Sequence, residues 1–545
     1  MLHGTPASEG IGLGRVMIVE EAKLEYNNVT VTDTEAEVER FRNAVKIFCD
    51  NTAAQADALK ASAGKKEAEI LEGHIQMMKD PYMCDMFISM FSATDDELTQ
   101  QRAADVKDLK TSMLSILLGV KEVKLSAAPK GTVVVAKELT PSMTAGINKE
   151  NIVGIITETG GKTSHSAILA RALEIPAVLS VNGAVSKLSA GAYVIVDGSE
   201  GVVIDEPDDA VIQEYDTKRI NFLKERKELE NFRGKATKAL SGEEYELFCN
   251  IGKPEDAIKA VDADGEGVGL FRTEFLFMDR TALPTEDEQF DAYKKAALTL
   301  KGKPVIIRTL DIGGDKEIPY LGLKKEENPF LGFRAIRYCL KHKDLFKTQL
   351  RAIVRASAFG DVRIMFPLIT AVEELREGKA LVEEVKAELR EQGVEFNENI
   401  PVGIMTETSA AVMIADILAK ESDFFSIGTN DLTGYTMACD RGNDDVAYLY
   451  SPLQPSVLRG IKYIIDCANK NNISVGMCGE AAANPMMVPL LMSFGLTEFS
   501  VSAPSVLKVR KTISAWSKAE ADKVAEKVLA MTTEKEISDY LKTLL

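Results

Sequence analysis

The feature that most constrains the fold is a series of eight short apolar segments, which alternate with helix-like stretches in residues 237–545. Apolar segments separated by stretches with apolar residues three and four apart are typical of strand–helix units with parallel strands. Eight such units predict a closed (β/α)8 barrel, and an open doubly wound sheet is the alternative. The segments are residues 245–252, 267–274, 304–312, 361–369, 402–408, 424–430, 473–480 and 498–504.

Charged and amide residues gather at the C-terminal ends of these predicted strands. In a parallel barrel, that end carries the loops in which active sites form. One charge there could belong to a structural ion pair, but the same placement on five strands favours a ligand site. The residues are Arg272, Glu274, Arg308, Asp311, Glu407, Asn430, Asp431, Cys478 and Glu480.

The types of these residues indicate an anionic ligand and a hard metal ion. Arg272, Arg308 and Arg441 offer forked donors that match phosphate and carboxylate oxygens. Glu407 and Asp431 are oxygen ligands, and these motifs contain no histidine, which favours Mg²⁺ over Zn²⁺. The Gly313-Gly314 pair would let backbone approach such an anion, although a glycine pair is a weak signal.

The first half of the chain has a different organisation. Residues 1–20 alternate small and apolar residues, which predicts an edge strand. Residues 21–122 are rich in Ala, Glu and Lys with helical spacing, which predicts a helical bundle inserted in an α/β domain made of residues 1–20 and 123–205. The charged residues 206–236 predict a linker helix, and residues 237–545 form the predicted barrel domain.

His165 differs from the other histidines of the chain. It follows a predicted strand and a Gly-rich turn, and Thr163 or Ser164 is a candidate N-cap for the helix that it opens. A helix N-terminus disfavours the imidazolium and offers backbone amides to an anion, so the ring can accept a phosphoryl group. A capping histidine in an ordinary turn is the alternative. The predicted apolar face of this helix includes Ile168, Leu169, Ala172 and Leu173.

Composition excludes several classes of partner and compartment. The formal net charge of −18 argues against nucleic acid or an anionic membrane as the main partner. No apolar run is long enough to cross a bilayer, and the N-terminus lacks a secretion signal. Seven dispersed cysteines are typical of reduced thiols. We therefore expect a cytoplasmic protein.

Taken together, the motifs resemble those of enzyme I of the bacterial sugar phosphotransferase system, the phosphoenolpyruvate–protein phosphotransferases. The resemblance runs along nearly the whole chain. The motifs that carry it are Gly160-Gly161-Lys162-Thr163-Ser164-His165, Leu270-Phe271-Arg272-Thr273-Glu274-Phe275, Arg308-Thr309-Leu310-Asp311-Ile312-Gly313-Gly314-Asp315-Lys316, Gly428-Thr429-Asn430-Asp431-Leu432, Asp440-Arg441-Gly442-Asn443 and Gly476-Met477-Cys478-Gly479-Glu480.

The resemblance implies a reaction and a role for each candidate residue. The phosphoryl group of phosphoenolpyruvate would pass to His165 and then to the histidine of the carrier protein HPr, with release of pyruvate, as the first step of the sugar phosphotransferase system. Glu407 and Asp431 would hold Mg²⁺. The residues that would bind phosphoenolpyruvate are Arg272, Arg308, Asn430, Asp431 and Arg441.

Cys478 would protonate the enolate that remains after phosphoryl transfer. A thiol with a near-neutral pKa could supply that proton, whereas a small buried hydrophobe is the alternative interpretation of a lone cysteine. The resemblance also implies that HPr docks on the inserted helices, with His74 and Met77 among the contacts. For His74, a place in the core is an equal alternative. Family members dimerise through the barrel domain.

The sequence departs from the family pattern at a few positions. Thr406 and Ser409 stand where the family usually has Val and Pro, and Gly434 stands where it normally has Gln. Activity is expected because every proposed chemical group is present. Pyruvate phosphate dikinase and phosphoenolpyruvate synthase share parts of the pattern, but they need an ATP-grasp domain that the preceding residues do not resemble. A regulatory scaffold that binds phosphoenolpyruvate without turnover is the non-enzymatic alternative.

Overall fold

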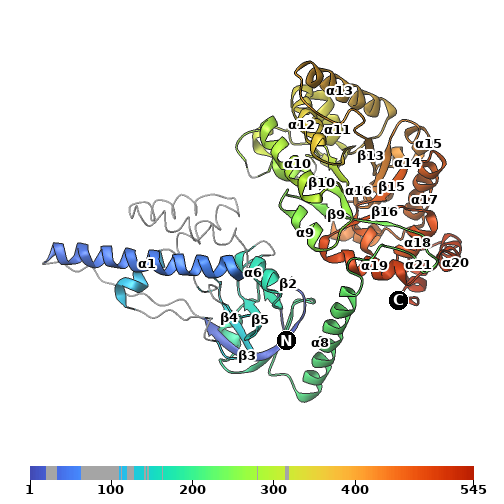
Figure 1. The fold of residues 1–545 in the computed structure, drawn as a ribbon. Coiled ribbons are helices and arrows are strands. Elements are labelled where there is room, and N and C mark those ends of the chain that lie inside the picture. Colours follow the sequence, from blue (N-terminus) through green and yellow to red (C-terminus); the bar gives the residue numbers. More distant parts are fainter. Residues whose placement is uncertain are drawn as a thin grey trace. The chain divides into compact units, whose positions relative to one another are not determined.

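A computed structural model gives the fold, and the chain divides into two compact units, Met1–Arg226 and Lys227–Leu545 (Figure 1). Among the described helices, none combines the length and the apolar character that crossing a membrane requires. The structure describes residues 1–19, 33–62, 110–111, 113–119, 125, 128–139, 143, 147–161, 164–278, 280–313 and 318–545.

The first unit contains an eight-stranded sheet with the order β1-β8-β7-β3-β4-β5-β6-β2. Its branched apolar residues are buried on both faces, because helices and loops cover the sheet. The strands are β1 (Leu2–His3), β2 (Thr5–Ser8), β3 (Ile11–Val19), β4 (Thr132–Ala136), β5 (Ile152–Thr157), β6 (Ala177–Leu179), β7 (Tyr193–Asp197) and β8 (Val202–Asp205).

Strand β3 lies inside this sheet, so the prediction of an edge strand is wrong for residues 11–19, whereas the two edge strands, β1 and β2, come from residues 2–8. It pairs antiparallel with β7 and parallel with β4. The small residues that suggested an edge have another cause: a Cβ on Gly12 would lie 1.9 Å from the carbonyl oxygen of Val153. The glycine is needed because backbone packs directly against this strand.

The described helices of the first unit include α1 (Thr34–Ser62), which is the long blue helix of Figure 1, α6 (His165–Leu173) and α7 (Ala184–Lys187). The side chains of Ala44 and Phe48 in α1 pack against Met113. Most of the predicted bundle, including His74 and Met77, lies outside the described residues. Helix α8 (Asp209–Glu230) lies within the predicted linker, and the division between the units falls inside it.

In the second unit, eight parallel strands close into a barrel with the order β10-β11-β12-β13-β14-β15-β16-β9. The predicted barrel is therefore confirmed, and the open sheet is excluded. Each strand falls within one of the predicted segments. The strands are β9 (Glu246–Ile251), β10 (Gly267–Arg272), β11 (Val305–Arg308), β12 (Val362–Phe366), β13 (Val402–Thr406), β14 (Phe424–Ile427), β15 (Ser474–Met477) and β16 (Glu498–Val501).

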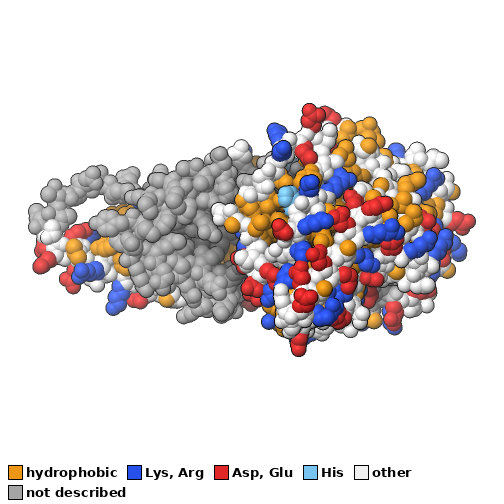
Figure 2. Space-filling view, turned by 90° about the horizontal axis from the view of Figure 1, so that it is seen from above, with side chains coloured by type: hydrophobic (Ala, Val, Ile, Leu, Met, Phe, Trp, Pro, Cys, Tyr) orange, Lys and Arg blue, Asp and Glu red, His pale blue; other side chains and the backbone are white. Residues whose placement is uncertain are grey.

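Helices enclose this barrel (Figure 1), and the large core of the unit lies between them and the strands. Figure 2 shows acidic and basic side chains interspersed over the face of the barrel unit that it presents. The helices are α9 (Asp256–Asp262), α10 (Glu286–Leu300), α11 (Ala335–Lys341), α12 (Lys343–Ala356), α13 (Val372–Glu391), α14 (Ser409–Met413), α15 (Ala415–Leu418), α16 (Thr429–Met437), α17 (Pro455–Lys470), α18 (Val488–Phe494), α19 (Val506–Ser514), α20 (Lys518–Leu529) and α21 (Glu534–Lys542).

A second, smaller apolar cluster fills the interior of the barrel below its C-terminal end. Because these side chains close the interior, a ligand has to bind where the strands end and the loops begin. The cluster consists of Leu270, Ile306, Met365, Met405, Phe424 and Cys478.

Candidate active site

The C-terminal ends of the barrel strands surround a cavity of about 510 Å³. Every barrel residue that the sequence predicts to bind substrate or metal or to act in catalysis lines this one cavity, because the C-terminal ends of parallel strands lie at the same rim. Asp311, Glu480, Asn250 and Arg334 line it as well. The predicted residues are Arg272, Arg308, Glu407, Asn430, Asp431, Arg441 and Cys478.

Two arginines of the cavity are held by carboxylates. Arg308, which is 6% exposed, donates to Glu274 Oε1 at 2.7 Å and lies 3.0 Å from Asp311 Oδ2. Arg272 is more accessible and donates to the same Glu274 oxygen at 3.1 Å. Burial alone would lower the pKa of Arg308, but Glu274 and Asp311 outweigh it and raise the pKa above its usual value. Glu274 therefore holds both guanidinium groups in place at the wall of the cavity.

Arg334 belongs to the site although sequence reasoning missed it. Its guanidinium is buried and donates to Asp311 Oδ1 at 2.9 Å. It is preceded by a loop and not by a strand, so the pattern of strand ends could not reveal it. Gly313 packs against this residue: a Cβ at position 313 would lie 2.6 Å from Arg334 Cβ, and the φ of Gly313 is +100°. The glycine makes room for Arg334, and the predicted approach of backbone to an anion is not needed to explain it.

Glu407 follows β13 and is 2% exposed. Its Oε1 accepts a hydrogen bond from the backbone N–H of Leu368 at 2.7 Å. Burial, followed by repulsion from Asp431 and Asp311, raises the pKa of Glu407 to about 8 despite the nearby arginines. A cation beside these carboxylates would relieve that repulsion, so the chemistry of the donors fits a hard metal ion.

Few of the described acidic side chains lie close enough together to bind such an ion, so the protein could supply only part of its ligands. Among the residues that the structure describes, no group of three or more His, Cys, Asp and Glu side chains could hold a metal ion. Glu407 and Asp431 would thus supply two ligands, and a substrate or water would supply the others, which is the usual pattern for Mg²⁺.

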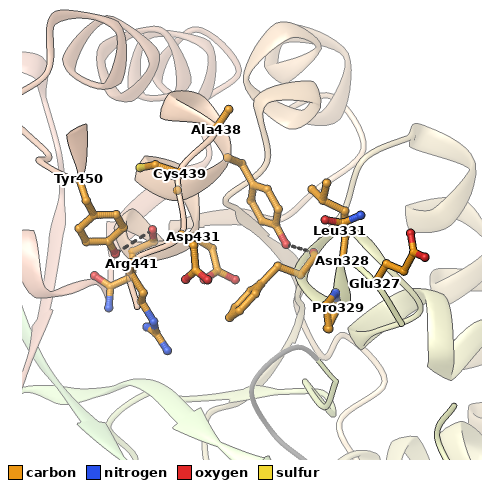
Figure 3. A pocket seen from close by; sticks show the side chains of 14 residues that line it. Glu327, Asn328, Pro329, Leu331, Asp431, Ala438, Cys439, Arg441 and Tyr450 are labelled. Carbon is orange, nitrogen blue, oxygen red and sulfur yellow. Dashed lines mark hydrogen bonds between the residues drawn. The ribbon is translucent and has the colours of Figure 1, made fainter. Parts of the chain in front are cut away.

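Asn430 and Asp431 lie in the first turn of α16, and Arg441 follows that helix. The backbone oxygen of Asn430 accepts a hydrogen bond from Tyr450 Oη at 3.0 Å. These residues also border a second pocket of about 370 Å³. Figure 3 shows Tyr450 on one side of that pocket and Pro329 and Leu331 on the other, with Asp431 between them.

Cys478 follows β15 and is buried, and its thiol lies 3.8 Å from the carbonyl oxygen of Ile427. Asn250, from the end of β9, donates to the Cys478 carbonyl oxygen at 3.0 Å. Burial raises the pKa of the Cys478 thiol to about 12, so the prediction of a near-neutral pKa is wrong. The physical consequence is that the thiol keeps its proton throughout the neutral range.

The departures from the family pattern leave the groups of the site in place. The hydroxyl of Thr406 donates to Ser426 O at 3.4 Å, and that of Ser409 donates to Tyr435 O at 3.1 Å. Gly434 lies on the wall of the second pocket. The carboxylates and guanidinium groups that line the cavity of about 510 Å³ are therefore present despite these three departures.

His165 lies in the other compact unit and begins α6. Of the two candidate caps, Ser164 is the N-cap and accepts from the backbone N–H of Ala167 at 3.4 Å. The helix buries Leu169 and Leu173, whereas Ile168 is 44% exposed, so its predicted place on the buried face is wrong. The side chains of His165 and Ala172 and the whole of Lys162 and Thr163 lie outside the described part of the chain.

Three family models match successive stretches of the chain. They are described as PEP-utilising enzyme, N-terminal, at residues 3–94; PEP-utilising enzyme, mobile domain, at residues 128–201; and PEP-utilising enzyme, PEP-binding domain, at residues 226–517. The third of these covers more than half of the chain.

Curated relatives match over almost the full length. The phosphoenolpyruvate-protein phosphotransferase of Priestia megaterium is 42% identical, with 99% of this chain and 98% of the relative covered. The proteins with the same name from Geobacillus stearothermophilus and Bacillus subtilis are 44% and 43% identical, each over 99% of this chain and over 97% and 99% of the relative. A solved structure of Enzyme I (nEIt) is 34% identical over 41% of this chain and 99% of its own, with a TM-score of 0.37.

Proposed function

The chain belongs to the phosphoenolpyruvate-protein phosphotransferase family, and from this premise we propose that it moves the phosphoryl group of phosphoenolpyruvate to His165 and then to the carrier HPr. The assignment of the site rests on one observation: arginines, carboxylates that include Glu407 and Asp431, and the buried thiol of Cys478 line the same cavity of the barrel. Pyruvate is the second product.

The arginines bind and orient the substrate. Phosphoenolpyruvate carries a phosphate and a carboxylate, and both match the forked donors of Arg272 and Arg308. Because Glu274 already fixes both guanidinium groups, little reorganisation is needed when negative charge shifts during transfer. Asn430 and Arg441 would contact the substrate from the opposite wall, which α16 and the loop after it form.

Members of this family generally use a divalent metal. We assign it as Mg²⁺, held by Glu407 and Asp431, because both are hard oxygen donors. When bound, the ion would neutralise charge on the phosphoryl oxygens. Glu407 is held ready for this role by its hydrogen bond from Leu368.

The proton balance assigns a role to Cys478. The bond between phosphorus and the enol oxygen breaks, and an imidazole nitrogen of His165 forms the new bond to phosphorus. The enolate left behind needs a proton on its methylene carbon to become pyruvate. Cys478 carries one at neutral pH, since its pKa is raised further above the ordinary value of 9.0, and it would regain a proton from water after pyruvate leaves.

The carrier would meet His165 at the beginning of α6. The exposed apolar side chain of Ile168 lies one turn from that end, which suits a protein contact next to the phosphorylated residue. The inserted residues 21–122, with His74 and Met77, remain the predicted docking subdomain for HPr. The predicted phosphohistidine domain remains residues 1–20 and 123–205. The predicted linker remains residues 206–236, and the predicted barrel domain remains residues 237–545.

Three exposed apolar or aromatic side chains on neighbouring helices of the barrel unit support the proposed homodimer. Met413 of α14, Ile417 of α15 and Tyr463 of α17 are 77%, 42% and 41% exposed. The three helices pack against one another, so their side chains belong to one region of the unit. The described cysteines are free, which agrees with a reducing cytoplasm as the proposed location.

The function is tested by incubating the full chain with phosphoenolpyruvate labelled on phosphorus, MgCl₂ and purified HPr. We expect acid-labile label on the chain and on HPr, with one pyruvate released for each phosphoryl group transferred. A chelator should stop uptake, and Mg²⁺ should restore it. Tight binding of phosphoenolpyruvate without label or pyruvate would contradict the proposal and favour a regulatory scaffold.

A further inference from the structure

One fully buried side chain contacts both of the segments that follow the substrate-binding arginines of β10 and β11. Gln349 lies on α12 and is 0% exposed. Its Oε1 accepts from the backbone N–H of Leu310 at 2.8 Å, and its Nε2 donates to Thr273 Oγ1 at 3.1 Å. Leu310 lies between Arg308 and Asp311, whereas Thr273 lies between Arg272 and Glu274 in the chain.

Thr273 extends this connection to a substrate-binding residue itself. Its hydroxyl is completely buried and donates to the carbonyl oxygen of Arg308 at 2.7 Å. In the sheet, Arg272 and Arg308 are paired residues at the last position of β10 and β11. The backbone pairing of β10 and β11 ends at Arg272 and Arg308. Beyond that point, hydrogen bonds of the Thr273 and Gln349 side chains connect the two chain segments.

The chemistry of the contacts requires an amide at position 349. A backbone N–H can only donate, so the group facing Leu310 must be an acceptor. The hydroxyl hydrogen of Thr273 is already used on Arg308, so the group facing Thr273 must be a donor. The second Nε2 hydrogen donates to Tyr293 Oη at 3.2 Å, and Tyr293 in turn donates to Gln289 Oε1 at 3.2 Å.

We propose that Gln349 and Thr273 are positioning residues, which hold the ends of β10 and β11 together so that Arg272 and Arg308 present their guanidinium groups at a fixed separation. This inference rests on the proposed function, because the separation matters for binding two anionic groups of one substrate. An ordinary buried glutamine would stabilise helix packing alone. Here, however, the amide bonds to the strand ends on both sides of the arginines.

The first test compares Gln349→Met with Gln289→Met in the full chain. Both changes replace a buried amide by an apolar side chain of similar length. Gln289, however, donates to Pro284 O and accepts from Tyr293 Oη, and neither partner lies on β10 or β11. We expect Gln349→Met to raise the KM for phosphoenolpyruvate on the order of tenfold and to lower kcat/KM by up to 10². Gln289→Met should lower the thermal midpoint while leaving KM at the parent value.

A second pair of variants keeps the test decisive if Gln349→Met does not fold. Thr273→Val keeps the shape of the side chain and removes both hydrogen bonds, whereas Thr273→Ser keeps the hydroxyl. We expect Thr273→Val to raise KM as Gln349→Met does, and Thr273→Ser to restore it to within about threefold of the parent. All assays are done at a temperature where circular dichroism shows folded protein.

The result that would overturn the inference is a set of folded variants in which the amount of active enzyme falls but KM does not change. That outcome would leave Gln349 and Thr273 with a stabilising role only. The parent chain separates this failure from failure of the proposed function. If the parent turns over phosphoenolpyruvate and the variants share its KM, the inference alone is wrong; if the parent does not turn over, the proposed function is wrong.

Discussion

The guanidinium of Arg334 lies 3.2 Å from the carboxylate of Asp431, one of the two proposed metal ligands. The same guanidinium bonds to Asp311, so one buried cation balances two acidic groups. Replacing it by a neutral group would leave these carboxylates with less counter-charge, and removing one partner of a buried ion pair is costly.

Arg334→Gln is therefore expected to lower kcat/KM by about 10² or more and to change the Mg²⁺ concentration that gives half-maximal activity. Arg337→Gln is the matched control, because Arg337 donates to the carbonyl oxygens of Leu331 and Gly332 and touches no carboxylate of the cavity. Steady-state kinetics at several Mg²⁺ concentrations measure both effects. Equal behaviour of the two variants would remove Arg334 from the site.

Cys478→Ala should still bind phosphoenolpyruvate, because it removes no phosphate or metal contact. Pyruvate formation should fall by a factor on the order of 10², which is the usual scale for a lost general acid. Binding is measured by calorimetry and pyruvate by a coupled assay. Pyruvate formation at the parent rate would assign Cys478 to packing only.

The raised pKa of Cys478 makes a second, independent prediction. A thiol with a pKa of about 12 stays protonated from pH 6 to pH 10, so its deprotonation should not limit the rate in that range. The kcat of the parent should therefore not decline between pH 6 and pH 10 through loss of the Cys478 proton. If the parent does show an alkaline decline, Cys478→Ser should show the same decline. A decline near pH 8 that Cys478→Ser lacks would show that the thiol ionises far more readily than its burial implies.

The pKa of Glu498, which is buried in the barrel interior, predicts how the free energy of unfolding changes with pH. Burial, then Glu246, raises the pKa of Glu498 to about 8, with Arg363 acting in the opposite direction. Because the folded-state pKa lies above the ordinary value of 4.5, its contribution to stability is present below pH 4.5 and is lost as pH rises through 8.

Glu498→Gln should therefore make the full chain more stable than the parent at pH 9, by up to about 5 kcal/mol, and should flatten the decline between pH 5 and pH 9. The exposed Glu391→Gln on α13 serves as the control and should change neither quantity. Urea unfolding at a series of pH values gives the free energies. An unchanged slope in Glu498→Gln would show that this carboxyl is not protonated in the fold.

A fragment of residues 1–235 should accept a phosphoryl group from phosphorylated HPr and should not react with phosphoenolpyruvate. It contains His165 and the predicted docking helices but none of the barrel arginines. Circular dichroism would first establish that the fragment folds. Label transferred to it directly from phosphoenolpyruvate would contradict the division of labour between the two units.

The sequence predicts the barrel and most of its cavity because two simple regularities determine them. The alternation of apolar segments and helical stretches defines the strands, and parallel strands bring their C-terminal ends together. Arg272, Arg308, Glu407 and Cys478 could thus be placed in one site although they are far apart in the chain. Their roles came from the family resemblance.

Other features depend on contacts that no local pattern contains. Arg334 reaches the cavity from a loop, Gln349 reaches the strand ends from a helix, and the pKa of Cys478 depends on the atoms that bury it. The place of β3 inside its sheet depends on pairing with strands more than 100 residues away, such as β7. These are properties of the folded chain as a whole.

The central claim is that His165 is the residue that phosphoenolpyruvate phosphorylates, and identification of the modified residue tests it most directly. After a brief reaction with phosphoenolpyruvate and Mg²⁺ at alkaline pH, mass spectrometry of the digested chain should find phosphohistidine in the peptide that contains His165. The His165→Ala variant should carry no phosphoryl group and should release no pyruvate when HPr is present. Phosphorylation of another residue, or pyruvate formation by His165→Ala at the parent rate, would contradict the account.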